Sequence, residues 1–493
     1  MMKKNTKTPT LGRDALRLTT SKVITMVITM LTAMLLSRFR TTEEYGTYSQ
    51  ILLVINLFTT MLMLGLPNSI NYFLARADTP EEREKFLSVF YTISTLLSAF
   101  IGLVLVLGVP LIEMYFHNSN IGKFYYFLAV YPWASIISSS IENVLVVFKK
   151  TTFLMVYRVI HSVAMLAAVV VIKLLNLGFS EYMISFVAVN AAFAVSVYVI
   201  AGRLSGGIRV SFDKSLIKAI FVFSIPMGLA AVVATLNTEI DKLLIGYLMS
   251  TDQLAIYTNA AKELPLAIVP ASITAVLLPR LTRLIKNGET EKAINLWKYA
   301  TELALMVICF FVAGVFTYAE EVITILYSEK YLPGVAVFRV YSLNLLLRAT
   351  YFGIVLNAFG KTKKILWCSI LSMVLNAILN PLFYWAFGMI GPAIATFIAI
   401  LVILILQLKM TTKITGVSFG NVFPWLNMGK VLLLNICFAG LFWGLKRIIP
   451  LELLLGGIAE SVILGTIWAA TYFFLMKRRI KQIWMSLNRE GDE

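Results

Sequence analysis

The chain has 493 residues, of which 59% are apolar, and a mean hydropathy of +0.82. This composition leaves too little polar surface to cover a water-soluble globule, so soluble classes of protein are excluded and the expected solvent is lipid. The formal net charge of +17 raises the separate question of a nucleic-acid partner.

Apolar runs of about 20 residues, the length that crosses a bilayer as a helix, recur along the chain. Barrel strands would instead alternate in polarity over about ten residues. We therefore expect an all-α polytopic membrane protein with about 14 transmembrane helices. The predicted spans are 18–36, 48–70, 86–107, 124–147, 153–175 and 182–201, then 216–249, 254–278, 299–318, 335–358, 365–387 and 389–408, and finally 431–445 and 453–476.

The cations follow the alternation of the loops. Of the 43 Lys and Arg, about 30 fall in loops on one side of the predicted spans, about seven on the other side and about six inside spans. The positive-inside rule then places the cation-rich loops and both termini in the cytoplasm, and the protein in the cytoplasmic membrane. Contact with anionic membrane lipids accounts for the excess charge, so no nucleic-acid partner is predicted.

Residues typical of cofactor sites are isolated in this sequence. Cys309, Cys368 and Cys437 each lie singly in an apolar run, without the spacing of metal ligands. The stretch 360–362, Gly-Lys-Thr, lacks the earlier glycine of a phosphate-binding loop, because Val355 occupies that position. We therefore predict no metal, no ATP site and no cofactor.

The second six spans repeat the first at an offset of about 210 residues. Thr-Glu-Glu-Tyr-Gly-Thr-Tyr at 42–48 matches Thr-Asp-Gln-Leu-Ala-Ile-Tyr at 251–257, and Phe-Lys-Lys-Thr at 148–151 matches Phe-Gly-Lys-Thr at 359–362. Because each unit has an even number of spans, the sequence predicts two parallel repeats around a central cavity, as in transporters. The predicted domains are a six-helix lobe at 1–205, a second at 206–415, and two further helices with a basic tail at 416–493.

Charges inside the spans require a partner, water or a function, because a charge at the bilayer centre costs at least about 2.5–3.5 kcal/mol. Glu142 and Arg158 lie at equal distances from the turn at 149–150, and His161 shares the face of Arg158. One interpretation is an ion pair that locks the hairpin, with a hydrogen-bonded histidine. The other is an arginine that faces a phosphate and has titratable neighbours.

A second group of charges surrounds the turn near Ser250. Asp241 and Lys262 lie about ten residues to either side of it, and Glu239 and Glu263 are close by in the sequence. Either an acid carries a coupling ion, or Asp241 and Lys262 neutralise each other.

Arg339 and Arg348 lie on roughly one face of the tenth span, which contains no acid. Arg348 is the deeper of the two, whereas Arg339 is close enough to the span end to reach headgroups. The predicted substrate-binding residues are Arg158, His161, Arg348 and Arg339, and the predicted ion-coupling residues are Asp241, Glu263, Glu239 and Glu142.

Short motifs resemble a known family. Glu43-Glu44-Tyr45-Gly46-Thr47-Tyr48, with a following span that ends Leu64-Gly65-Leu66-Pro67, resembles the opening of the polysaccharide (O-antigen) flippases. Asp241-Lys242-Leu243-Leu244-Ile245-Gly246 and Leu278-Pro279-Arg280-Leu281 resemble the same family, whose superfamily includes MATE drug exporters and lipid II flippases.

The resemblance implies a MATE-like fold and a transporter rather than an enzyme. The implied substrate is an undecaprenyl-diphosphate-linked oligosaccharide, flipped by ion-coupled alternating access with a proton or sodium ion. A polysaccharide polymerase and glycosyltransferases are the implied partners.

Three alternatives differ from this interpretation in sequence features. A drug or metabolite exporter that resembles the MATE proteins would usually carry an acidic residue in its first helix, and residues 23–36 contain none. A membrane glycosyltransferase or polymerase would carry a large outer loop or a nucleotide-sugar domain. A non-catalytic scaffold of a polysaccharide-assembly complex remains open, because no single residue establishes transport.

Overall fold

The computed structural model describes residues 11–262, 266, 268–448 and 457–492, and every regular element within them is helical. Twelve helical stretches in this part of the chain are long and apolar enough to cross a membrane. One of the twelve, Thr362–Thr415, contains two helices, α15 (Thr362–Phe387) and α16 (Gly391–Thr415). The predicted all-α membrane fold is confirmed, and the count of 14 helices remains a prediction.

Contacts divide the chain into two compact units. Unit 1 comprises Met1–Glu239 and Ile245–Ala255, and unit 2 comprises Ile240–Leu244 and Ile256–Glu493. The division therefore falls within helices α8 (Lys214–Leu248) and α9 (Thr251–Ala260). The domain boundaries expected at residues 205 and 415 remain predictions.

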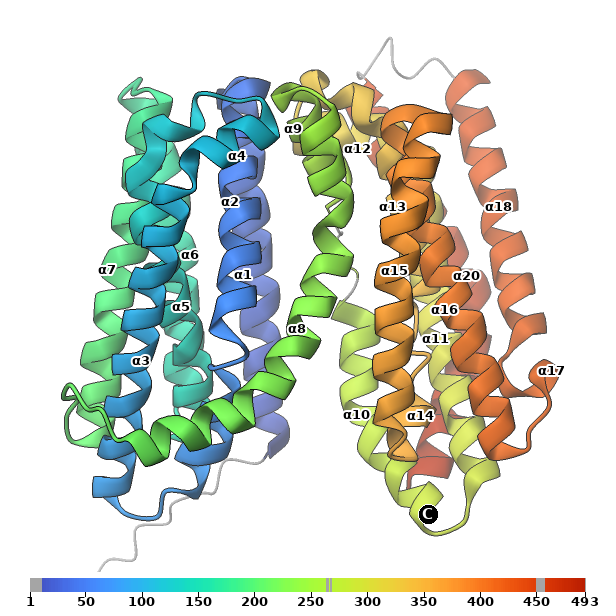
Figure 1. Ribbon diagram of the computed structural model, residues 1–493. Helices are drawn as coiled ribbons and strands as arrows, with labels where there is room; N and C mark the ends of the chain where they lie inside the picture. Colours follow the sequence, from blue (N-terminus) through green and yellow to red (C-terminus); the bar gives the residue numbers. More distant parts are fainter. Residues whose placement is uncertain (1–10, 263–265, 267, 449–456, 493) are drawn as a thin grey trace, which may run out of the picture. The chain divides into compact units, whose positions relative to one another are not determined.

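Unit 1 is a bundle of long helices with short elements at their ends (Figure 1). In chain order it contains α1 (Leu11–Phe39), α2 (Thr42–Met63), the π-helix η1 (Ile70–Leu74), α3 (Pro80–Leu107), α4 (Val109–Phe116), the 3-10 turn η2 (Ile121–Phe124), α5 (Tyr125–Val147), α6 (Thr151–Leu174) and α7 (Phe179–Ser205). Capping boxes start α2, at Thr41 and Glu44, and α3, at Thr79 and Glu82. Each box satisfies backbone N–H groups that a helix start otherwise leaves without partners.

Glycine permits close helix crossings in unit 1. A Cβ at Gly102 of α3 would lie 2.4 Å from the carbonyl oxygen of Ala129 in α5. A Cβ at Gly228 of α8 would lie 2.1 Å from the carbonyl carbon of Leu64, where α2 ends. Small residues at such crossings let backbones approach within membranes, where packing drives helix association. Helix α8 also contains Pro226 and is bent (Figure 1).

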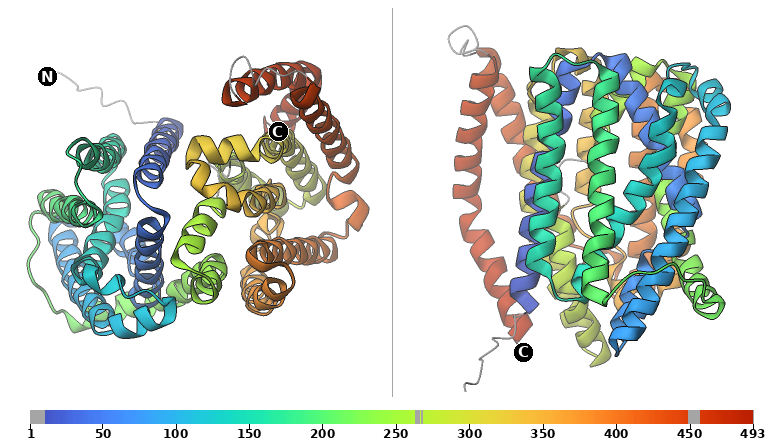
Figure 2. Two further views of the ribbon diagram at one scale, coloured as in Figure 1. Left: turned by 90° about the horizontal axis from the view of Figure 1, so that it is seen from above. Right: turned by 90° about the vertical axis from the view of Figure 1, so that its left-hand side faces the viewer.

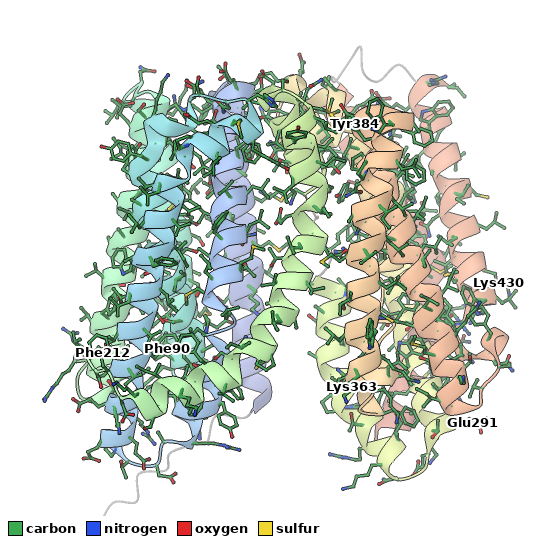
Figure 3. All side chains as sticks on the ribbon, in the orientation of Figure 1. Phe90, Phe212, Glu291, Lys363, Tyr384 and Lys430 are labelled. Carbon is green, nitrogen blue, oxygen red and sulfur yellow. The ribbon has the colours of Figure 1, made fainter. Side chains whose placement is uncertain are left out.

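An extended segment, residues 207–213, follows α7 and runs along α3. The backbone N–H of Arg209 donates to Ser88 Oγ at 3.0 Å, and that of Ser211 donates to Thr92 Oγ1 at 3.1 Å. Figure 3 shows Phe212 projecting outward from this segment. The chain therefore enters α8 from a position fixed on unit 1.

Unit 2 contains a second set of long helices. Its further elements are α10 (Ile268–Lys286), α11 (Thr290–Thr317), α12 (Ala319–Leu326), the 3-10 turn η4 (Glu329–Gly334), α13 (Val335–Leu347), α14 (Ile354–Ala358), α15, α16, α17 (Phe419–Val422), α18 (Trp425–Ile448) and α20 (Gly457–Asp492). Helix α11 packs against α10, α13, α18 and α20 and holds the buried Trp297. The prediction of one continuous helix over 335–358 is wrong, because α13 ends at Leu347 and α14 begins at Ile354.

The last two long helices are fixed to α11 by polar and aromatic contacts. Glu302 of α11 is buried and accepts hydrogen bonds from Arg479 of α20 at 2.7 and 3.1 Å and from Asn427 of α18 at 2.9 Å. Elsewhere along them, Phe442 of α18 stacks on Trp468 of α20 with ring centroids 5.3 Å apart. Helices α18 and α20 contact each other in unit 2, and Figure 2 shows them in red in two further views.

The internal repeat is visible in the order and length of the elements. Helices α3 and α11 both have 28 residues and begin at residues 80 and 290, an offset of 210 (290 minus 80). Helices α4 and α12 both have 8 residues and begin at residues 109 and 319. Helices α7 and α16 both end at a left-handed glycine, Gly206 and Gly416. The predicted duplication is therefore confirmed at the level of single elements.

One face of α15 shows how the protein meets lipid. Six of its exposed large apolar residues are spaced three or four apart, which places them on one face: Trp367, Leu371, Val374, Ile378, Leu382 and Trp385. The two tryptophans lie about 27 Å apart along the helix, close to the thickness of a bilayer core. Figure 3 shows Lys363 and Tyr384 towards opposite ends of the same helix. This distribution matches an apolar band between interfacial aromatic residues.

Candidate functional site

Arg348 lies where a helix of unit 2 is interrupted. It forms the C-terminal cap of α13, and the chain then leaves the helical conformation until Ile354. Within this break, Thr350 Oγ1 accepts a hydrogen bond of 3.0 Å from the indole Nε1 of Trp297 in the core. Gly353 is the last residue of the interruption and the N-terminal cap of α14. Its helix propensity, about 1 kcal/mol below that of alanine, favours a break at this position. Interrupted helices are common at the binding sites of transporters, because they expose polar groups at membrane depth.

The break lines a cavity of about 600 Å³. Helices α10, α15 and α16 form its other walls, and its polar side chains are Thr274, Arg348, Thr350, Tyr351, Ser372 and Gln407. Among the residues described around this cavity, Arg348 has the one charged side chain. A guanidinium group with hydroxyl and amide neighbours offers several donors to an anion and suits a phosphate.

Arg339 has a different environment from Arg348. Its Nη2 lies 3.3 Å from Glu320 Oε1, and its Nε donates to the carbonyl oxygen of Phe316 at 3.2 Å. It is absent from the lining of the Arg348 cavity, within the described residues. The two arginines therefore belong to different sites, and a binding role for Arg339 remains a prediction.

Arg158 and Glu142 form an ion pair between α6 and α5. Lys22 of α1 adds a second cation 3.8 Å from Glu142. His161 contacts α7 instead, with its Nε2 3.2 Å from Asn190 Oδ1 and its ring against Phe193. The hairpin geometry thus brought the expected pair together, and these contacts favour the interpretation as a structural pair. Substrate binding by Arg158 and His161 remains a prediction.

Asp241 is a buried carboxylate held by two tyrosines of unit 2. Its Oδ2 accepts hydrogen bonds from Tyr257 of α9, at 2.9 Å, and from Tyr341 of α13. Its Oδ1 accepts the backbone N–H of Lys242 at 2.8 Å. Among the described residues no ion pair joins Asp241 to Lys262, so the contacts do not support mutual neutralisation of the two. A carboxylate surrounded by phenol hydroxyls is suited to hold a proton or a monovalent cation.

Two of the other acids predicted for ion coupling have partners other than Asp241. The Oε1 of Glu239 accepts a hydrogen bond of 3.3 Å from Asn56 in unit 1, and Glu142 is paired with Arg158. Glu263 lies outside the described residues. A coupling role for these three acids remains a prediction.

Sequence reasoning missed the tyrosines that hold Asp241. Tyr257 ends the stretch that matches residues 42–48, so the repeat had marked its position without indicating its role. Buried amides were missed as well: Asn344 lies one turn beyond Tyr341 on α13, and Asn380 lies on α15. The side-chain amides of both have no hydrogen-bond partner in the described part of the chain. Amide and carboxylate oxygens are ligands for hard cations, although the described residues contain no group of three or more His, Cys, Asp or Glu suited to a metal ion.

Helical elements that recur in two units, with an interrupted helix in the second, define a multi-pass membrane protein with an architecture common among transporters. Solved structures agree with this fold. The inward closed conformation of the lipid II flippase MurJ superposes with a TM-score of 0.73 at 16% identity, over 93% of this chain and 99% of that one. An inward-facing MATE multidrug transporter gives a TM-score of 0.61 at 15% identity, over 80% and 96% of the two chains. At these identities the likeness establishes the fold alone.

Sequence comparison gives the family. A family described as polysaccharide biosynthesis protein matches residues 35–336, more than half of the chain, and this protein belongs to it. A probable lipid II flippase MurJ of Rhizobium meliloti (strain 1021) is 22% identical over 129 residues. That match covers 25% of this chain and about a quarter, 24%, of the relative's length.

Proposed function

We propose that the protein flips an undecaprenyl-diphosphate-linked oligosaccharide across the cytoplasmic membrane for the biosynthesis of a surface polysaccharide. Membership of the polysaccharide biosynthesis family supports a role in the biosynthesis of a polysaccharide. The fold shared with the flippase MurJ supports a lipid-linked substrate. The observation that carries the proposal is Arg348, placed at the interruption between α13 and α14 in a cavity of about 600 Å³.

A diphosphate that enters an apolar cleft loses its hydration shell, so the protein must replace those hydrogen bonds. The planar guanidinium of Arg348 donates paired hydrogen bonds to phosphate oxygens better than an ammonium group does. Thr350, Ser372 and Gln407 supply further polar groups in the same cavity. Because Trp297 already holds Thr350 in place, this part of the site is ordered before the substrate arrives.

Replacement of Arg348 tests the proposal. Arg348→Ala should abolish export of the surface polysaccharide at wild-type protein level in the membrane, and Arg348→Lys should retain part of it. Arg339→Ala is compared with it, because Arg339 is the other predicted substrate-binding arginine of this span and pairs with Glu320. Wild-type export by Arg348→Ala would exclude this arginine as a substrate ligand. Loss of drug resistance with normal polysaccharide export would instead favour a MATE-like exporter.

We infer that transport is coupled to a proton or a sodium ion at Asp241. The inference is supported by the burial of this carboxylate in unit 2 and by its tyrosine partners. In vesicles with an imposed ion gradient, Asp241→Asn should remove gradient-driven flipping and leave substrate binding intact. Unchanged dependence on the gradient would assign Asp241 to structure alone.

We also propose that both termini lie in the cytoplasm, because the cation-rich loops share one side of the predicted topology. Glycosyltransferases would then build the substrate at the face where it enters, and a polymerase would use it at the other face. A reporter active only in the cytoplasm, fused after residue 493, tests this orientation. Activity of a periplasmic reporter at that position would contradict it.

A further inference from the structure

We propose that the Arg348 cavity binds the diphosphate together with the adjoining isoprenoid units of the carrier lipid, and that the sugar stays outside it. This inference rests on the proposed function and narrows it to one part of the substrate. It predicts that this site recognises the carrier, which all substrates of the class share, rather than the sugar.

The lining of the cavity has a polar part and an apolar part. Its polar groups come from the break and from α15 and α16, with Arg348 as the charge. Its apolar part comes from α10 and α16: Pro270, Ala271, Ala275, Ile400, Ile403 and Leu404. A cation beside an apolar wall is complementary to an anion that is joined to a hydrocarbon.

A sugar fits this lining poorly. The hydroxyl and amide side chains of the lining can bond some of its hydroxyl groups, but hydroxyls buried against the aliphatic wall would lack partners and cost free energy. The described lining contains no carboxylate, and much of its wall is aliphatic. An isoprenoid segment, in contrast, gains from contact with the same aliphatic side chains.

The size of the cavity sets how much of the substrate enters. Pockets of about 300–1,000 Å³ bury ligands of drug size, and the cavity of about 600 Å³ falls in that range. A complete lipid-linked oligosaccharide is far larger. The cavity therefore accommodates the junction of diphosphate and lipid, and the remaining chain and the sugar extend from it.

Two alanines provide a way to change the apolar part alone. Ala271 and Ala275 are one turn apart on α10, so they share a face, and both line the cavity. A phenylalanine at Ala275 would fill the apolar part without altering a polar group. Ala167 of α6 is an exposed alanine among exposed valines in unit 1 and serves as the matched control position.

The experiment measures binding of four probes to the purified full-length protein: farnesyl diphosphate, inorganic pyrophosphate, farnesol and a nucleoside-diphosphate sugar. Farnesyl diphosphate should bind at least about 100-fold more tightly than pyrophosphate, because its hydrocarbon adds apolar burial. The nucleoside-diphosphate sugar should bind no more tightly than pyrophosphate. Arg348→Ala should weaken both diphosphates, which separates site binding from partition of farnesol and farnesyl diphosphate into detergent.

The variants test the division of the cavity. Ala275→Phe should weaken farnesyl diphosphate at least about tenfold and leave pyrophosphate unchanged, whereas Ala167→Phe should change neither. If Ala275→Phe does not yield folded protein, Ala271→Leu tests the same wall with a smaller side chain. Equal affinities for farnesyl diphosphate and pyrophosphate, or tighter binding of the sugar nucleotide, would overturn this inference and leave the Arg348 site in place. Normal polysaccharide export in cells that lack this protein would overturn the proposed function itself.

Discussion

Helix α5 of unit 1 and the pair α13 and α14 of unit 2 occupy the same place in the repeat, yet only the pair is interrupted. Helix α5 is continuous over 23 residues, whereas α13 ends at Leu347. At the repeat offset of 210, Ser138 of α5 corresponds to Arg348 (348 minus 210). The same helix of the repeat is therefore continuous in unit 1 and interrupted in unit 2, and the interruption begins at a cation, Arg348.

The intramembrane arginines show the same contrast. Arg158 in unit 1 is paired with Glu142 on the neighbouring helix, which is the arrangement of a structural ion pair. Arg348 in unit 2 faces a cavity with hydroxyl and amide neighbours. The described surroundings of the two arginines therefore differ: an ion pair in unit 1 and a cavity with polar walls in unit 2.

The largest expected effect concerns the crossing of α3 and α5 in unit 1. The residue at the crossing differs between the two repeats. Gly102 of α3 corresponds to Val312 of α11, which is buried. Gly102→Val should prevent accumulation of folded protein, because its side chain would meet the backbone of Ala129. Val312→Ala should fold with a loss of about 2 kcal/mol in the free energy of unfolding. Membrane expression and the monodisperse fraction after purification measure both, and a normal yield of Gly102→Val would contradict the close crossing.

The next effect concerns the segments that hydrogen-bond to two corresponding helices, α3 of unit 1 and α11 of unit 2. Thr92 of α3 accepts a backbone N–H from the segment after α7, and the corresponding Glu302 of α11 holds Arg479 and Asn427. Arg479→Ala should lower the free energy of unfolding by about 3 kcal/mol, because it leaves a buried carboxylate without its charge partner. Glu302→Gln should cost less, since Arg479 is partly exposed to solvent and the amide oxygen still accepts. Thermal unfolding of the two variants compares them, and equal losses would contradict this explanation.

A smaller effect concerns the matched tyrosines Tyr48 and Tyr257. Tyr48 packs against the ring of Tyr182, whereas Tyr257 donates to Asp241. Tyr257→Phe should shift the ion concentration for half-maximal transport by about tenfold, because a hydrogen bond to a charged group contributes about 1.5–3 kcal/mol. Tyr48→Phe should leave that concentration unchanged. A shift of equal size in both variants would indicate a general loss of packing instead.

The sequence predicted the features that depend on local pattern. Apolar runs located the spans, a shared offset revealed the repeat, and equal distances from one turn paired Glu142 with Arg158. It did not predict the interruption after Leu347, because the residue types at 348–353 do not distinguish a break in a membrane helix from a continuous helix. The partners of Asp241 were missed because they come from 16 and 100 residues away. Contacts between distant helices leave no periodic signal in a single sequence.

The repeats also diverge after their sixth helices, where unit 1 continues into the segment that precedes α8. Asp213 caps α8 by accepting the backbone N–H of Leu216 at 3.0 Å, and its Oδ2 lies 2.6 Å from Lys85 Nζ. The hydrogen bond from Lys85, with those from Ser215 and Leu216, holds the pKa of Asp213 well below its usual value. Helix α16 of unit 2 instead leads through α17 into α18.

The smallest expected effect is therefore a pH-dependent one at Asp213. Because its folded-state pKa is depressed, its stabilising contribution is present above the unfolded-state pKa of about 3.9 and is lost as the pH falls below that value. Asp213→Asn keeps a side chain that caps helices and removes the charge. The variant should unfold about 1 °C below the wild type at pH 6, since exposed ion pairs contribute little, and the difference should begin to shrink as the pH falls below about 4. Lys85→Met should behave alike, because it removes the other half of the pair. A difference that stays constant from pH 3 to pH 7 would show that capping geometry, rather than charge, accounts for the role of Asp213.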